Sequence, residues 1–274
     1  MLRISQGQLN LLSTCPRKFQ HVVLDQLGTP EAIDQQERLQ QGAQFHRLLQ
    51  QWLLALPVEL VVQQDAQLQQ WFASFQAASA RILGDGLPQP ECDRLLEFEG
   101  YLLTARYDVL ITNQQHARIL DWKTYPRPPA PQRLEQHWQT RLYPFILAET
   151  STYQPDQIAM VYWFFQSNQD RDGLDRGVPQ SLIFQYNQHK HAATRRELRS
   201  LLHQLTQWLA HYQAGESLPQ LKEGATACDA CAFALRCGRI PVDLNDSLQD
   251  AEEGNHNDRF FALSSLADIA EVPL

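Results

Sequence analysis

The stretch Ala117-Arg-Ile-Leu-Asp-Trp-Lys-Thr-Tyr125 decides the fold of this 274-residue chain. Its residues favour a β-strand, and the strand ends on a carboxylate and an amine, Asp121 and Lys123, two residues apart. Because side chains alternate between the two faces of a strand, both groups point to the same side. A pattern of this kind is usually only a solvated strand edge, so the rest of the sequence must decide whether it marks a functional site.

A second strand-like segment, Tyr101–Ile111, precedes the first and carries Asp108 among β-forming residues. The polar residues 113–116 between the two segments suit a turn, so we expect the segments to pair as a hairpin. That pairing would place Asp108 beside the carboxylate and the amine of the other strand. Two carboxylates and a lysine can together hold a divalent cation and orient a water molecule toward a phosphodiester bond.

The composition is that of a soluble globular protein, with 43% hydrophobic and 20% charged residues. No apolar run approaches a membrane span, and the N-terminus lacks the apolar core of a signal peptide, so we expect a cytoplasmic protein. The net charge is −8, but residues 243–274 hold eight acids and one base, which leaves −1 for residues 1–242. We therefore expect one domain over 1–242, able to carry a local basic groove, and an acidic, flexible tail over 243–274.

Four of the five cysteines are spaced like metal ligands: Cys15, and then Cys228-x2-Cys231-x5-Cys237. A tetrahedral centre needs four ligands, and a cytosolic disulfide framework is unexpected, so we predict a metal centre that joins the two ends of the chain. Closing so long a loop is worth on the order of 5 kcal/mol in the simple chain-entropy model. The ligand chemistry alone allows zinc as well as iron–sulfur, and the fifth cysteine, Cys92, is expected to be an ordinary free thiol.

Together with three further motifs, these features resemble the PD-(D/E)XK nuclease superfamily, and specifically the RecB-type, CRISPR-associated-nuclease-like exonucleases that carry an iron–sulfur cluster. The resemblance covers about residues 5–240 in order. The three motifs are Leu-x2-Cys15-Pro-Arg-Lys-Phe, Gly42-x3-His46 and Gln139-x3-Tyr143. Each also has a plain structural explanation: a buried cysteine between two helices, a polar histidine on a helix face, and a tyrosine that simply packs.

The resemblance implies an α/β fold of the restriction-endonuclease-like type, in which helices flank a mixed central sheet. A helical N-terminal region and a C-terminal cysteine segment would complete the domain. We expect strands at about 95–99, 101–111, 117–123, 158–165 and 181–186. We expect helices at about 37–55, 64–83, 132–149 and from 189 onward, with a break in the chain at 84–90.

The resemblance also implies a function, namely metal-dependent hydrolysis of DNA phosphodiester bonds, on single strands or DNA ends, in repair or recombination. The implied ligands of Mg²⁺ or Mn²⁺ are Asp108, Asp121, His46 and the carbonyl of Trp122. Lys123 would position the attacking water. Gln139 and Tyr143 would contact the DNA strand.

The same resemblance assigns a structural [4Fe–4S] cluster to Cys15, Cys228, Cys231 and Cys237, with Zn²⁺ as the alternative. Family members usually carry a glutamate on the strand before the first metal-binding aspartate, and Glu97 and Glu99 are both candidates for it. They also usually have glycine where this chain has Ala105, three residues before Asp108, although alanine still permits close packing.

Two alternatives remain open. One is a catalytically silent DNA-binding or assembly module of the same fold that carries the iron–sulfur cluster or zinc; the retained Asp108, Asp121 and Lys123 argue against it. The other is a zinc-bound structural protein with no nuclease lineage. The chain has no Walker Gly-x4-Gly-Lys-Ser/Thr loop, so a helicase or other repair partner would be a separate subunit.

Overall fold

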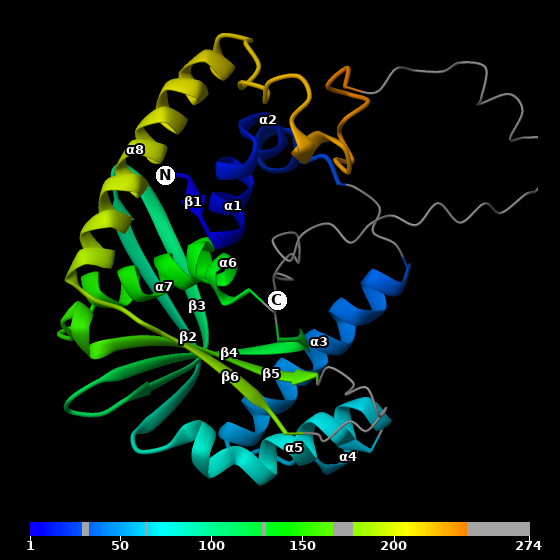
Figure 1. Ribbon diagram of the computed structural model, residues 1–274, viewed down its shortest axis with the longest axis vertical. Helices are drawn as coiled ribbons and strands as arrows, with labels where there is room; N and C mark the ends of the chain where they lie inside the picture. Colours follow the sequence, from blue (N-terminus) through cyan, green and yellow to red (C-terminus); the bar gives the residue numbers. More distant parts are fainter. Residues whose placement is uncertain (29–32, 64, 128–129, 167–177, 240–274) are drawn as a thin grey trace, which may run out of the picture. The chain divides into compact units, whose positions relative to one another are not determined.

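The computed structural model describes residues 1–28, 33–63, 65–127, 130–166 and 178–239 (Figure 1). The predicted acidic tail, 243–274, lies outside these described residues. The chain forms two compact units. The first holds Met1–Gly7 and Glu31–His203, and the second holds Gln8–Pro30 and the described chain from Gln204 onward.

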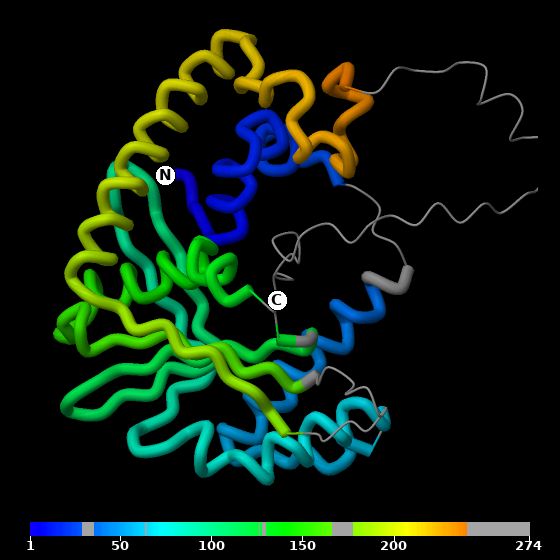
Figure 2. Tube along the Cα trace, in the orientation of Figure 1, coloured from blue at the N-terminus to red at the C-terminus, as the bar shows by residue number. Residues whose placement is uncertain are grey.

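A six-stranded mixed sheet forms the centre of the first unit in the described part of the chain (Figures 1 and 2). Its strands are β1 (Arg3–Ile4), β2 (Leu87–Phe98), β3 (Tyr101–Thr112), β4 (Ala117–Pro126), β5 (Ile158–Gln166) and β6 (Gln180–Gln185). Neighbours run antiparallel in the pairs β2–β3, β3–β4 and β5–β6, and parallel in the pairs β4–β5 and β1–β3. The predicted mixed α/β architecture is therefore confirmed.

β3 and β4 form the hairpin that the sequence predicts, with Val109 opposite Leu120. Asn113 holds the turn, because its side-chain oxygen accepts hydrogen bonds from two backbone N–H groups of the turn. One step beyond the paired residues, this register places Asp108 across from Asp121. β4 then continues along β5, which supports the strand as far as the end that carries the two charged side chains.

β2 is longer than the sequence predicts, because the expected break at 84–90 gives way to a strand that begins at Leu87. β3 offers pairing partners along its whole length, as far as Thr112 opposite Leu87. Two prolines are tolerated in β2 because, among the described strands, it pairs with β3 alone. The hairpin turns over two residues, Glu99 and Gly100, whose φ angles of 50° and 81° are of the positive kind that tight hairpin turns require.

Helices α3 (Ile33–Leu53), α4 (Glu59–Val62) and α5 (Ala66–Leu83) follow one another, and α3 and α5 cover one face of the sheet (Figure 1). An aromatic core fills the interface: Phe75 lies 5.8 Å from Trp122, and Phe45 lies 4.8 Å from Phe165, between ring centroids. α5 begins where predicted because the Asp65 carboxylate accepts hydrogen bonds from two backbone N–H groups of its first turn. The two ring contacts hold α5 against β4 and α3 against β5.

The opposite face of the sheet is covered by α7 (Trp138–Glu149), which follows α6 (Pro131–Gln136). The sequence predicts one helix over 132–149, but the chain is extended at His137, with ψ of 143°. The break leaves no unpaired acceptor at Leu134, because its carbonyl accepts from both the His137 N–H and the Thr140 hydroxyl. The Thr140 hydroxyl also lies 2.8 Å from that of Tyr162 on β5, and this contact fixes α7 over the sheet.

The second unit joins segments from both ends of the chain. It contains most of α1 (Gln6–Thr14), then α2 (Pro16–Phe19), a π-helical turn (Gln20–Leu24), the last part of α8 (Gln188–Gln213) and a short 3₁₀ turn, Thr226–Cys228. Hydrogen bonds link the ends: the Leu218 N–H donates to the side chain of Gln20, Arg17 donates to the Leu218 carbonyl, and Tyr212 donates to Asp25. None of the helices in the described ranges has the length and apolar character needed to cross a membrane.

Removing the ring at position 75 should test how far the fold depends on the aromatic core. Phe75 has no exposed surface, so we expect Phe75→Ala to lower the free energy of unfolding by about 3–5 kcal/mol in urea denaturation. The control Leu60→Ala removes a side chain that is 78% exposed and should change it by less than about 0.5 kcal/mol. Equal urea midpoints for both variants would contradict this packing.

Candidate active site

The first unit brings together most of the residues that the sequence singled out for catalysis. Four elements contribute them: Asp108 from β3, Asp121 and Lys123 from β4, His46 from α3, and Gln139 from α7. They form two connected groups, one around Asp108 and one around Asp121.

The Asp108 group links a strand, a helix and the backbone of β4. One carboxylate oxygen accepts from the Trp122 N–H at 2.7 Å, and the other lies 3.2 Å from His46 Nδ1. His46 Nε2 lies 2.9 Å from the Trp122 carbonyl oxygen. Both ring nitrogens thus face hydrogen-bond acceptors, and a protonated imidazolium ring has an N–H donor for each of them. Burial lowers the pKa of His46, but the charge and hydrogen bond of Asp108 outweigh burial and raise the pKa to about 9.

The Gly-x3-His motif has a steric explanation. A Cβ atom at Gly42 would lie 3.1 Å from the Thr124 hydroxyl oxygen, closer than ordinary van der Waals contact. Glycine therefore lets α3 approach the end of β4. His46 follows four residues later on the same helix face, which brings its ring to the Trp122 carbonyl. The structure thus gives a steric reason for the spacing of Gly42 and His46.

The Asp121 group is buried and held by an amide. Lys123 Nζ lies 2.7 Å from Asp121 Oδ2, and Gln139 donates to Asp121 Oδ1 at 2.6 Å. Lys123 also donates to the side-chain oxygen of Gln139, Oε1, at 3.1 Å. The pKa of Asp121 is raised to about 7. Burial and the charge of Asp108 raise it, and together they outweigh Lys123, which lowers it. Burial lowers the pKa of Lys123, but Asp121 outweighs that effect and holds the pKa well above its ordinary value.

Gln139 and Tyr143 do not have the exposure that their predicted role requires. The two residues are 4% and 2% exposed, so neither side chain offers surface to a DNA strand. Gln139 instead spans Asp121 and Lys123, and the ring of Tyr143 packs edge-on against that of Tyr107, 5.3 Å away. Their expected contact with the strand is thus unsupported, and Gln139 forms hydrogen bonds with Asp121 and Lys123.

The third carboxylate at the site is Glu91, which the sequence analysis missed. Counting seven residues along each strand from the pair Phe98–Tyr101 places Glu91 across from Asp108. Burial and the charge of Asp108 raise the pKa of Glu91 to about 6. Its φ of 49° is unusual for a residue with a side chain, so this position is strained.

Both glutamates proposed from the sequence lie elsewhere, and that prediction was wrong. Glu97 pairs with Leu102, six positions along β3 from Asp108. Glu99 lies in the hairpin turn and forms an ion pair with Arg199 at 2.6 Å. The signal for Glu91 was available in the tight turn at Gly100, which fixes the register of the whole hairpin.

The site carries oxygen donors of the type that a hard divalent cation prefers, although among the described residues no three His, Cys, Asp or Glu side chains are already arranged to hold one. Asp121 Oδ2 is buried and lies 2.7 Å from Lys123 Nζ, its ion-pair partner. The raised pKa of Asp121 indicates that the surrounding groups compensate its charge only in part. A metal ion would supply the missing positive charge. It would bind His46 only after the ring loses its proton.

The four spaced cysteines all lie in the second unit, and each is half-buried. The Sγ atom of Cys237 lies 3.7 Å from His21 Nε2. Burial raises the pKa of Cys237, Arg17 lowers it, and the charges of the other three cysteines raise it again, so the four thiols lie within electrostatic range of one another. Nevertheless, no three His, Cys, Asp or Glu side chains in the described ranges, these cysteines included, are arranged to hold a metal ion.

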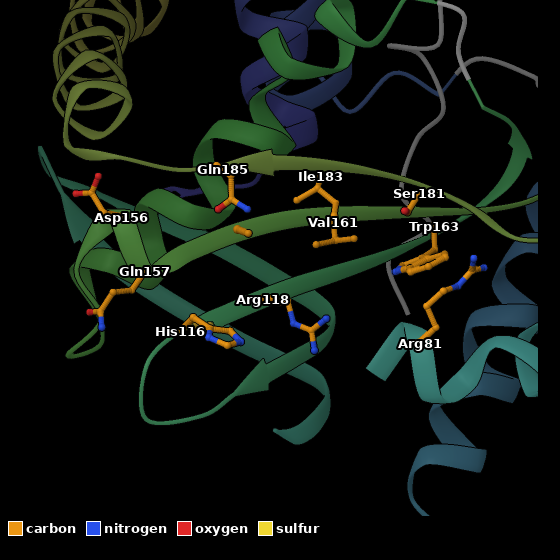
Figure 3. A pocket seen from close by; sticks show the side chains of 12 residues that line it. Arg81, His116, Arg118, Asp156, Gln157, Val161, Trp163, Ser181, Ile183 and Gln185 are labelled. Atoms are coloured by element: carbon orange, nitrogen blue, oxygen red, sulfur yellow. The ribbon is translucent and has the colours of Figure 1, made fainter. Parts of the chain in front are cut away.

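A cavity of about 420 Å³ lies away from these charged groups (Figure 3). Val161 and Trp163 of β5 line it, and they alternate along the strand with Tyr162, the partner of Asp121. The cavity therefore opens on the sheet face opposite Asp121, with Arg81 and Arg118 at its side (Figure 3). Since it contains none of the predicted catalytic residues, the charge pattern marks the candidate site better than the concave surface does.

Comparison with known proteins supports the same fold. A family model described as the PD-(D/E)XK nuclease superfamily matches residues 3–238. A crystal structure named "Putative exonuclease", from Eubacterium rectale, has a TM-score of 0.53 at 11% identity and covers 92% of this chain and 94% of that chain. The structure of SSO0001 covers 87% of each chain at 12% identity, with a TM-score of 0.37 that is too low to support an argument. No curated protein sequence matches.

The role of Gln139 can be separated from strand binding. Gln139→Leu leaves a buried carboxylate and a buried ammonium short of a hydrogen bond, so we expect the free energy of unfolding to fall by about 1–3 kcal/mol without any nucleic acid present. Gln136→Leu, at an exposed position on α6, is the control and should have little effect. If Gln139→Leu left urea denaturation unchanged but weakened DNA binding, the result would support the prediction that Gln139 contacts the DNA strand.

Glu91 and Glu97 can be compared directly as metal-site carboxylates. We expect Glu91→Gln to weaken Mn²⁺ binding by about tenfold or more, because it removes a charge across from Asp108. Glu97→Gln changes the same chemical group far from the site and should leave binding unchanged. Calorimetric titration of both variants checks this, and equal affinities would remove Glu91 from the site.

Proposed function

Because the chain belongs to the PD-(D/E)XK nuclease superfamily, we propose that it is a divalent-metal-dependent deoxyribonuclease that hydrolyses phosphodiester bonds in DNA. The observation that carries the proposal is the convergence of Asp108, Asp121 and Lys123 just beyond the last residue pair between β3 and β4, Val109 and Leu120. The sequence motifs favour single-stranded DNA or DNA ends as the substrate, and repair or recombination as the setting. A helicase, if one takes part, would be a separate subunit.

In this proposal Asp108, Asp121, His46 and the Trp122 carbonyl hold Mg²⁺ or Mn²⁺, and Glu91 adds a third carboxylate. When bound, the ion stabilises negative charge on the scissile phosphate. The hard oxygen donors suit either metal. The hydrogen bonds and the ion pair among these groups keep the donors near one another, and the groups would have to rearrange around the ion when it binds.

Lys123 would hold the attacking water rather than deprotonate it. Its pKa is well above the ordinary value, because the charge of Asp121 outweighs the effect of burial, so it stays protonated and serves as a donor. Gln139 keeps Asp121 and Lys123 in fixed relation through one hydrogen bond to each. The ammonium can then orient the water oxygen toward phosphorus and also offset the charge that develops there.

We propose that the four cysteines hold a structural [4Fe–4S] cluster, or Zn²⁺, which joins the ends of one nuclease domain over residues 1–242. The support is chemical: four thiols share a unit in which the N-terminal and C-terminal segments are hydrogen-bonded together. The cluster has no part in the hydrolytic step as proposed. Its contribution would be to stability.

The decisive test is cleavage of labelled single- and double-stranded DNA by anaerobically purified protein with Mg²⁺ or Mn²⁺. We expect Asp121→Ala and Lys123→Ala each to lower the rate by about a hundredfold or more. Asp156→Ala removes an exposed acid on the short turn before β5 and should cleave like the wild type.

Absorbance and circular dichroism should show that folding and any cluster are intact in each variant. Equal cleavage by all four proteins would indicate a contaminant and overturn the site assignment. DNA binding without cleavage under any of these conditions would favour the catalytically silent module.

A further inference from the structure

Next to the catalytic carboxylates, the β2–β3 hairpin carries a second charged pair, Asp93 directly opposite Arg106. Arg106 Nε lies 2.8 Å from one oxygen of Asp93, and a second guanidinium nitrogen donates to the other oxygen at 3.3 Å. The Arg106 side chain is 47% exposed and that of Asp93 is 59% exposed. The pair is thus bidentate and open to solvent.

This pair continues directly into the candidate active site. Arg106 and Asp108 are two residues apart on β3, so their side chains leave the same side of the strand. Across the hairpin, Asp93 and Glu91 stand in the same relation on β2. Glu91 Oε2 lies 4.0 Å from Arg106 Nε, which places the guanidinium beside the carboxylate group of the site.

Because the site is rich in carboxylates, binding of anionic DNA there requires a positively charged side chain that the substrate can reach. A DNA strand is anionic, and the carboxylates around Asp108 would repel it wherever a metal ion does not neutralise them. Lys123 is only 16% exposed and is engaged by Asp121 and Gln139. Arg106 is the better placed of these two cations, since half of its side chain is accessible and its planar fork matches the oxygens of a phosphate.

We propose that Arg106 binds a backbone phosphate of the DNA strand beside the scissile bond, and that Asp93 occupies the guanidinium in the free protein in place of that phosphate. The inference rests on the proposed nuclease function and adds a substrate-positioning residue to it. A carboxylate and a phosphate present similar pairs of oxygens, so the exchange conserves both hydrogen bonds. Exposed ion pairs stabilise folded proteins little, so releasing Asp93 costs little.

The two partners should have opposite effects on DNA binding. Equilibrium binding is measured with a fluorescent single-stranded oligonucleotide in Ca²⁺, and a denaturing gel checks that the oligonucleotide stays uncut. We expect Arg106→Gln to weaken binding by about tenfold and to reduce the slope of log affinity against log salt by about one. We expect Asp93→Asn to tighten binding several-fold, because it frees the guanidinium.

The double variant and the conservative variant separate this role from a purely structural one. Asp93→Asn should have no effect in the Arg106→Gln background, since Asp93 acts only through Arg106. Arg106→Lys should recover part of the binding. If the pair merely stabilised the hairpin, both single variants would weaken binding in the same direction and would both unfold at lower urea concentration.

Arg199→Gln is the matched control, because Arg199 is also an exposed arginine in an ion pair, with Glu99 in the hairpin turn. It should change binding much less than Arg106→Gln. If the wild type neither binds nor cleaves DNA, the proposed function fails and this inference fails with it. If the wild type binds and cleaves while Arg106→Gln behaves like Arg199→Gln, the nuclease assignment stands and the role of Arg106 is overturned.

Discussion

The buried contact between Asp121 and Lys123 is the constraint on which the rest of the first unit depends. A carboxylate and an ammonium are removed from water at the end of a strand, which is costly unless each has further partners. The neighbouring strand β5 shields them, α7 brings Gln139 to both, and β3 brings Asp108 close by. The order of the strands and the position of α7 supply the partners that offset the cost of burying Asp121 and Lys123.

The same contact is part of the reason why the charges at the site are only partly compensated. Asp121 keeps a raised pKa beside its lysine, and His46 keeps a raised pKa beside Asp108. Carboxylates and a cationic ring thus hold one another at short distances, each only partly compensated. Such a balance suits a site that exchanges a proton or an internal cation for a metal ion, because the carboxylates still lack part of the positive charge that would compensate them.

The sequence predicted those parts of the molecule that depend on local pattern. The period-two alternation gave the β3–β4 hairpin and hence the meeting of Asp108 with Asp121, and the spacing of Gly42 and His46 marked a real close approach of helix and strand. The parts that failed depend on partners distant in sequence. β2 extends through two prolines only because β3 is there to pair with, and the link of Gln139 to Asp121 and Lys123 is visible only in the folded chain.

The two-residue turn at Glu99 and Gly100 also sets the register between β2 and β3. From this turn, the register places Asp93 opposite Arg106, and the same count places Glu91 across from Asp108. Adding one residue to each strand would move both pairs outward together and keep them opposite. Adding one residue to β2 alone would exchange its faces and present Cys92 where Glu91 now stands. The positions of both charged pairs therefore depend on equal strand lengths on the two sides of the turn.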